Sequence, residues 1–302
     1  MKLVGMIAWC GTVLLAACTT NPPDPRSDDT PTKGDILVLA DEDFRIILES
    51  EKFAFESIYE NAKVRIMYLP EAELLKRMMD DSVRVVFTTC LPGVEQEAYF
   101  RTRNLSPDMV PVLTDGVALV QGLKAADGTI TLDQLRASIS EGAQPRALFD
   151  GAGTGVVRSL VDSLFAGNAS QVRTASTMAN TDSLVRRIAI DDRSVGLLSF
   201  ARISDLDNPA CRALREGLTL CAVSDTGAAV LPNQSTLADG SYPLRRTLYA
   251  LLVEGRSGLG TGFVSFVAYQ RPTDHPQIRL GPDQGSSPQC GDHQSIEPWK
   301  PE

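Results

Sequence analysis

The sequence predicts an α/β fold in which a mostly parallel sheet is covered by helices on both faces. Two observations predict this class. From residue 35 onward, short apolar runs of strand length alternate with amphipathic stretches of helix length, and the first three such pairs follow one another directly. Hydrophobic residues make up 43% of the 302-residue chain, which is enough for a packed core in one large domain or two medium ones.

The first half of the chain contains three predicted pairs of a strand and a helix. The predicted strands span residues 35–40, 63–69 and 83–89. The predicted helices span residues 44–59, 70–79 and 95–100. Pro70 suits the first turn of its helix, where a backbone N–H has no partner within the helix. Strands that are joined by helices in this way run parallel and are buried on both faces.

The second half continues the alternation less regularly. Strands are predicted at residues 110–120, 147–149, 195–200 and 218–224. Helices are predicted at residues 132–139, 155–165, 181–190, 242–253 and 262–269. From residue 281 the chain lacks the apolar residues needed for packing, so we expect residues 281–302 to form a disordered tail.

The N-terminus has the features of an exported lipoprotein. Lys2 precedes an apolar run that is too short to span a bilayer, and the run ends in Leu15, two alanines and Cys18, which resembles the lipobox of bacterial lipoproteins. We therefore predict a signal peptide over residues 1–17, lipid on Cys18, and a flexible tether over residues 18–34. The mature chain would be anchored by its lipid at a cell-envelope membrane and face the periplasm.

Composition argues against several classes of function. The formal net charge is -9 and no Lys/Arg-rich run occurs, so a nucleic-acid interface is not expected. The histidines, His275 and His293, lie close to the C-terminus, and no Cys/His spacing indicates a metal site. Motifs of the GxSxG, HExxH and Walker A types are absent from the sequence, so we predict no catalytic residues and no cofactor.

Two cysteines are candidates for a disulfide, because export exposes thiols to an oxidising compartment. Cys211 and Cys221 lie ten residues apart, a spacing that a hairpin or a loop-to-strand return could bridge. The alternative is two separate thiols. The states of Cys90 and Cys290 stay open.

Several short segments occur in an order that is typical of one family. They are the strand-to-helix passage at 39–44, Thr114–Ala118 (TDGVA), Asp150–Thr154 (DGAGT), Val195–Leu198 (VGLL) and Tyr242–Arg245 (YPLR). Over about residues 35–280 the chain resembles the phosphate ABC transporter substrate-binding family, the PstS-type periplasmic binding proteins, in the short lipoprotein form found in many Bacteroidota. The resemblance implies two α/β lobes with a ligand cleft between them. The expected divisions are 35–117 and 231–280 for lobe one and 118–230 for lobe two, with crossing strands near 114–120 and 223–231.

The resemblance also implies ligand-binding residues at this cleft. They are Asp41, Glu42, Asp43, Thr88, Thr89, Asp150, Gly151, Ala152, Gly153 and Thr154. A helix N-terminus attracts an oxyanion because its first N–H groups are unpaired and lie at the positive end of the helix dipole. The turn from Gly151 to Thr154 has the form of such a site, or is only a tight turn that Thr154 caps.

Four features depart from the family's pattern. Acidic residues occupy positions 41–43, where phosphate binders commonly offer serine and threonine. Either Asp41 or Asp43 could accept a phosphate proton, or all three acids could cap the helix and complement its dipole. Cys90 and Leu148 stand where the family has arginine, and Ala152 stands where it has serine. We therefore expect weaker phosphate binding than in a high-affinity receptor, or a different ligand.

The resemblance and the departures leave two main functions open. One is the capture of phosphate or a related small oxyanion for an ABC permease, at a membrane reached through the lipid anchor. The alternative is a family member with a degenerate site that acts as a sensor or surface interaction protein, with another ligand or none. Arg245 or Arg246, at the start of the predicted helix 242–253, could point toward the cleft. An enzyme is a third reading, against which the absent motifs argue.

Overall fold

A computed structural model describes residues 29–125, 128–255 and 257–270. The strands are β1 (Gly34–Asp41), β2 (Ala62–Leu69), β3 (Val83–Thr88), β4 (Asp108–Gly122), β5 (Thr129–Thr131), β6 (Arg146–Phe149), β7 (Ser176–Thr177), β8 (Ser194–Ser199), β9 (Leu218–Leu220), β10 (Ala222–Ser224) and β11 (Arg245–Leu252). The helices are α1 (Arg45–Ile58), α2 (Glu71–Arg77), α3 (Val94–Thr102), α4 (Leu132–Ser140), α5 (Gly155–Phe165), α6 (Thr181–Ile190), α7 (Pro209–Arg215), α8 (Gln234–Ala238) and α9 (Leu259–Gln270). Short 3-10 helices are η1 (Glu42–Phe44), η2 (Ala169–Gln171) and η3 (Phe200–Arg202).

One continuous sheet has the strand order β2-β1-β3-β11-β4-β8-β6-β7, with β9 also paired to β4. At one end β2, β1 and β3 run parallel, and at the other β8, β6 and β7 do. The long strands β11 and β4 lie antiparallel between these two groups. The α/β class with a mostly parallel sheet and flanking helices is thus confirmed.

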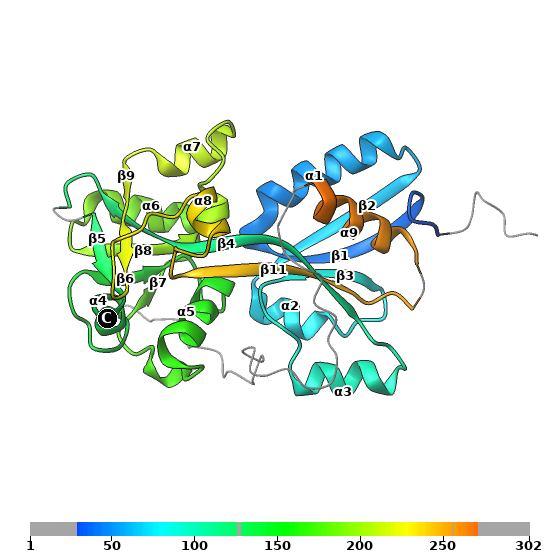
Figure 1. The fold of residues 1–302 in the computed structure, drawn as a ribbon, viewed down its shortest axis with the longest axis horizontal. Helices are drawn as coiled ribbons and strands as arrows, with labels where there is room; N and C mark the ends of the chain where they lie inside the picture. The colour runs from blue at the N-terminus through cyan, green and yellow to red at the C-terminus, as the bar shows by residue number, and fades with distance from the viewer. Residues whose placement is uncertain (1–28, 126–127, 256, 271–302) are drawn as a thin grey trace, which may run out of the picture.

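The two halves of the sheet carry separate hydrophobic cores, which we call lobe one and lobe two. In lobe one, α1 and α9 cover one face, where Phe44, Phe87 and Phe263 are buried, and α2 and α3 cover the other face. In lobe two, α4, α5 and α6 pack against the strands β8, β6 and β7 (Figure 1). Both lobes therefore bury the sheet on two sides, as the continuous apolar strands predict.

Two strands cross between the lobes and run side by side along the long axis in Figure 1. β4 pairs with β11 through Gly116 and with β8 and β9 from Val117 onward. The second crossing strand is β11. Just before it begins, Leu244 O accepts a hydrogen bond from Val117 N–H at 2.8 Å. The buried Tyr242 hydroxyl donates to Val117 O at 2.6 Å and so fastens this crossing to β4.

Most predicted elements are confirmed, but the last part of lobe two differs. The helix expected at 242–253 is instead a turn followed by β11, in which buried positions alternate with more exposed ones over most of the strand. The chain consequently returns to lobe one near residue 245, because Leu237, Tyr242 and Leu244 all belong to the core of lobe two. Residues 223–231, which were expected to cross between the lobes, therefore remain within lobe two. The strand expected at 218–224 is interrupted at Cys221 and forms β9 and β10.

The expected disulfide between Cys211 and Cys221 is not formed, and both residues are buried free thiols. Cys221 N–H donates to Leu119 O at 2.8 Å, which holds its thiol over β4, where Sγ donates to Gln121 Oε1 at 3.3 Å. Cys211 lies on α7. Cys211 is thus in a helix and Cys221 lies between β9 and β10, so the two cysteines do not lie on facing strands.

The predicted signal peptide, Cys18 with its lipid and the tail at 281–302 lie outside the described residues. The end of the predicted tether is within them and is ordered. Thr30 and Lys33 form a β-bridge, and Asp29 Oδ1 accepts a hydrogen bond from Leu259 N at 2.8 Å, at the start of α9. Residues 29–34, which were expected to belong to a flexible tether, therefore pack against the domain. Among the helices in the described ranges, none is long and apolar enough to cross a lipid bilayer.

Candidate functional site

A cavity of about 370 Å³ lies between the lobes. Seven of the predicted ligand residues line it: Asp41, Glu42, Asp43, Asp150, Gly151, Ala152 and Thr154. Its remaining walls are Pro70, residues 177–181 and Arg202, so that both lobes contribute. Seven predicted residues thus share one cavity, whereas Thr88, Thr89 and Gly153 do not line it.

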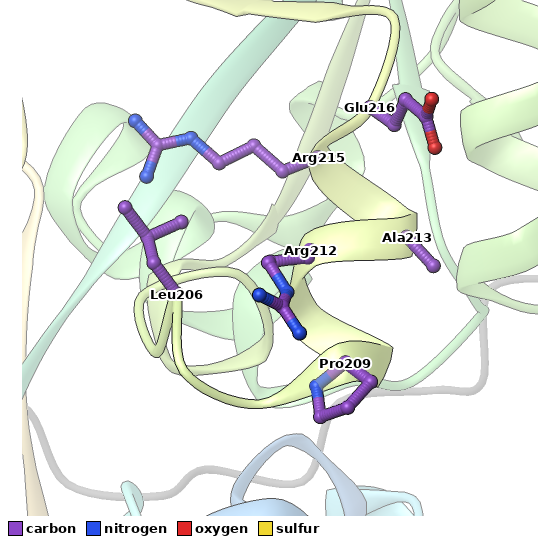
Figure 2. Close-up of a pocket in the computed structure, with 6 residues that line it drawn as sticks. All are labelled: Leu206, Pro209, Arg212, Ala213, Arg215 and Glu216. Carbon is purple, nitrogen blue, oxygen red and sulfur yellow. The ribbon is translucent and has the colours of Figure 1, made fainter.

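A second hollow, of about 570 Å³, lies on the surface at α7 and is a weaker candidate. Its side chains radiate from the helix instead of converging on one point (Figure 2). Arg212 and Glu216 are exposed there, and water satisfies such groups. A binding site needs convergent polar groups, so the interlobe cavity is the better candidate despite its smaller volume.

The lobe-two wall is the turn between β6 and α5. Gly153 has φ of 73°, a left-handed conformation that glycine adopts without strain, and its carbonyl accepts a hydrogen bond from Ala72 N at 3.2 Å across the cleft. Thr154 is the N-cap residue of α5, yet its side chain makes no capping bond. Its Oγ1 is buried and has no partner among the described residues. The start of α5 thus presents unsatisfied donors toward lobe one.

The three consecutive acids of lobe one have different roles. Asp41 Oδ1 accepts a hydrogen bond from Asp43 N at 3.1 Å as the cap of η1. Asp43 is ion-paired with Arg246 at 2.7 Å and with Arg202 at 3.1 Å. Glu42 is half-exposed and makes only a loose pair with Arg45 at 3.6 Å. Of these three acids, only Asp41 and Asp43 are therefore buried in the cleft.

The buried acids titrate in opposite directions. Burial, reinforced by the charges of Asp43 and Glu71, raises the pKa of Asp41 well above its usual value. Burial acts in the same sense on Asp43, but the two guanidinium groups outweigh it and hold the pKa of Asp43 below its usual value. Burial together with the charge of Asp43 raises the pKa of Asp150 to about 7. Asp41 therefore favours its protonated form, and Asp150 changes charge near neutral pH.

Arg246 places a cation at the point where the lobes meet. Its Nε donates to Asp115 Oδ2 at 2.9 Å and its Nη2 donates to Asp43 Oδ2 at 2.7 Å. Nη1 is buried and has no partner within the described part of the chain. A Cβ added to Gly155, the first residue of α5, would lie 2.6 Å from Asp41 Oδ2 and 2.8 Å from Arg246 Nη1. The start of α5 therefore packs directly against the Asp41 carboxyl group and the unpaired guanidinium nitrogen of Arg246.

Thr88 and Thr89, which were expected to contact the ligand, instead bind a side chain of the protein. Both hydroxyls and the Thr89 N–H donate to Glu71 Oε1, at distances between 2.8 and 3.2 Å. Glu71 is the first residue of α2 and is 1% exposed. The predicted donors are thus close to the cleft, but a carboxylate of the chain occupies them.

The family follows from a match that spans nearly all the described chain. The model of the PBP superfamily domain matches residues 26–271. This chain belongs to the PBP superfamily. The family resemblance noted from the short segments is confirmed at this level. No curated protein matches the chain.

Solved structures share this superfamily fold at low identity. A candidate phosphate ABC transporter substrate-binding protein with bound phosphate from Clostridium perfringens has a TM-score of 0.62 and 14% identity, covering 78% of this chain and 93% of that one. An ABC-type phosphate transport receptor from Vibrio cholerae has a TM-score of 0.59 and 12% identity, covering 77% and 93%. The CcmR regulatory domain of Synechocystis PCC6803 in complex with 2-PG has a TM-score of 0.53 and 12% identity, covering 80% and 98%. At such identities the likeness shows the fold alone.

Three charged residues of this superfamily member were missed or only considered as candidates. Arg246 was weighed at the start of a helix; reading 245–252 as a strand would have put it on the same face as Leu248 and Ala250. Glu71 follows Pro70 and resembles any acid in a first helical turn. Arg202 follows the buried strand β8, and nothing in its sequence surroundings indicates the cleft.

No group of three or more His, Cys, Asp or Glu side chains in the described ranges is placed to hold a metal ion. What the arrangement can do chemically is bind: it combines a helix N-terminus, a buried cation and carboxyl groups that differ in protonation.

Proposed function

We propose that the chain is a solute-binding protein that holds a small oxyanion, with phosphate as the first candidate, between lobe one and lobe two. The observation that carries this proposal is the set of buried donors at the start of α5. Arg246 Nη1 and Thr154 Oγ1 find no partner in the ranges that the structure describes, although buried polar groups are normally satisfied. An anion at the N-terminus of α5 would satisfy both and complement the helix dipole.

The acids of the cleft are compatible with such a ligand only if they do not add their full negative charge. Asp43 is neutralised by its two arginine partners. Asp41 favours its protonated form, so its Oδ2, which lies against Gly155, can donate a hydrogen bond to the anion. Asp150 loses its proton near pH 7. We therefore expect oxyanion affinity to be higher at mildly acidic than at alkaline pH.

The wider role in this proposal is that of a receptor for an ABC importer. The fold is shared with proteins described as phosphate transport receptors, which supports this role. The chain would be exported, anchored by lipid on Cys18, and would deliver its ligand to a permease. Closure of the two lobes about β4 and β11 would signal occupancy to that partner.

Thermal shift and calorimetry on the mature chain with Cys18→Ser test the ligand. Phosphate, arsenate and sulfate should be titrated at pH 5.5 and pH 8. We expect heat and a rise in Tm with phosphate or arsenate, larger at pH 5.5, and a weaker effect after Arg246→Lys, since a single ammonium nitrogen cannot occupy the separate donor positions of the guanidinium fork. Absence of any response at millimolar concentrations of all three anions would refute the oxyanion proposal.

A second candidate is a family member that works as a sensor or interaction protein without binding an oxyanion. The occupation of the Thr88 and Thr89 donors by Glu71 favours it, because the chain supplies its own carboxylate where a ligand oxygen could bind. The shared fold of regulatory domains such as CcmR is compatible with this role. The same titrations separate the two candidates.

A further inference from the structure

The carboxylate of Glu71 is held in an unusual way for a residue in a first helical turn. Its helix does not use it as a cap, because Glu73 N and Leu74 N donate to Pro70 O instead. Oε1 accepts three hydrogen bonds from the end of β3: from Thr88 Oγ1 at 3.0 Å, from Thr89 N at 3.2 Å and from Thr89 Oγ1 at 2.8 Å. Oε2 is buried and finds no partner among the described residues.

The donor set that holds Glu71 has the composition of an oxyanion site. Two hydroxyls and one backbone N–H converge on a single oxygen, which is a common way for proteins to bind an anionic oxygen. The set adjoins the start of α5, because a Cβ added to Gly155 would be 3.0 Å from Thr89 Oγ1 as well as close to Asp41 and Arg246. The two groups of donors thus lie close together at the start of α5.

We propose that Glu71 determines the specificity of the cleft by acting as a built-in competitor for the anion. This inference rests on the proposed oxyanion function. The carboxylate occupies the Thr88 and Thr89 donors and leaves the incoming anion only the donors of α5 and Arg246. A ligand in wild-type protein must therefore bind with a partial set of donors.

The charge of Glu71 acts in the same direction as its occupancy. The charge of Glu71 is one of the charges that raise the pKa of Asp41, so the two carboxyl groups lie close enough to interact. A dianion would add a further negative charge beside them, whereas a singly charged anion would add less. The wild-type cleft should therefore prefer a monoanion, and dihydrogen phosphate over hydrogen phosphate.

Two substitutions separate occupancy from charge. Glu71→Ala removes both, freeing three donors, so phosphate affinity measured by calorimetry at pH 7.5 should increase at least tenfold over wild type. Glu71→Gln retains an oxygen that can accept the three bonds but removes the charge, so the gain should be smaller. Glu73→Gln, an exposed residue on the same helix, is the matched control and should leave affinity unchanged.

Thermal unfolding gives a second readout. The donors orphaned in Glu71→Ala should lower its Tm without ligand, and phosphate should raise that Tm by more than it raises the wild-type value. If Glu71→Ala does not fold, Glu71→Gln carries the test, and an affinity no higher than wild type overturns the inference.

The outcomes distinguish this inference from the proposed function. Binding by wild type with no gain in Glu71→Ala overturns the role of Glu71 and leaves the oxyanion function standing. Binding by Glu71→Ala alone supports the role of Glu71 and refutes oxyanion binding by the wild-type protein. If neither protein responds to phosphate, the inference is overturned together with the function.

Discussion

Replacing Arg246 by methionine tests whether one guanidinium joins the crossing strands to the cleft. The substitution leaves Asp115 and Asp43, both buried, without the cation that bridges them at 2.9 and 2.7 Å. Breaking a buried ion pair from one side costs about 3–5 kcal/mol. The lower end applies here because Ser199 Oγ still donates to Asp115 and Arg202 still pairs with Asp43. We expect a loss of about 3 kcal/mol in the free energy of unfolding, which corresponds to about 6–12 °C in Tm.

Urea denaturation followed by circular dichroism measures this loss. The matched control is Arg245→Met, since Arg245 is the exposed neighbour on the same strand and should change stability by about 0.5 kcal/mol or less. Arg246→Lys should fall between the two, because lysine retains the charge but not the fork of donors. If Arg246→Met and Arg245→Met have the same stability, the guanidinium does not join the crossing strands to lobe one and the reasoning is wrong.

Three further predictions concern pH, closure and thiols. Because the pKa of Asp150 is about 7 in the folded chain, above its ordinary 3.8, the folded state binds this proton more tightly. The contribution of Asp150 to stability should therefore be fully present below pH 4 and be lost as pH rises through 7, by about 2–3 kcal/mol between pH 5 and pH 8, and Asp150→Asn should flatten this slope. Gly155→Ala places a Cβ 2.6 Å from Asp41 Oδ2, so it should destabilise the closed lobes by about 1–3 kcal/mol in urea denaturation and weaken phosphate binding in calorimetry. Burial raises the pKa of Cys221 to about 12, so this thiol should react with an alkylating reagent only after denaturation, without prior reduction.

Each of these has a contrary result. An unchanged pH slope in Asp150→Asn would mean that another group causes it, with Asp41 the first to examine. Gly227→Ala is the control for Gly155, because its added Cβ meets nothing within 4 Å, and equal effects of the two would remove the steric argument. Recovery of a peptide in which Cys211 is disulfide-linked to Cys221 would contradict the free thiols seen in the structure.

The sequence alone was sufficient for the elements whose signals are local. The helix predicted at 155–165 has those bounds in the structure, because a glycine-rich turn and Thr154 mark its start and apolar residues recur at helical spacing along it. The helix at 181–190 likewise begins after the cap Asn180. The order of these segments was enough to expect the two-lobed fold, and seven of the ten residues predicted to bind a ligand line the cavity between the lobes.

Only the tertiary structure decided what the charged residues of the cleft do. Residues 242–253 contain apolar residues compatible with either period, and pairing with β3 and β4 made residues 245–252 a strand, which turned Arg246 inward. Two residues of the same type, Asp41 and Asp43, then acquired pKa values shifted in opposite directions. Asp43 lies beside two arginines, whereas Asp41 is buried beside other carboxyl groups. The folded chain also brings the Glu71 carboxylate to the end of β3, where Thr88 donates a hydrogen bond to it. Contacts between segments distant in sequence set burial and charge, and no local pattern encodes them.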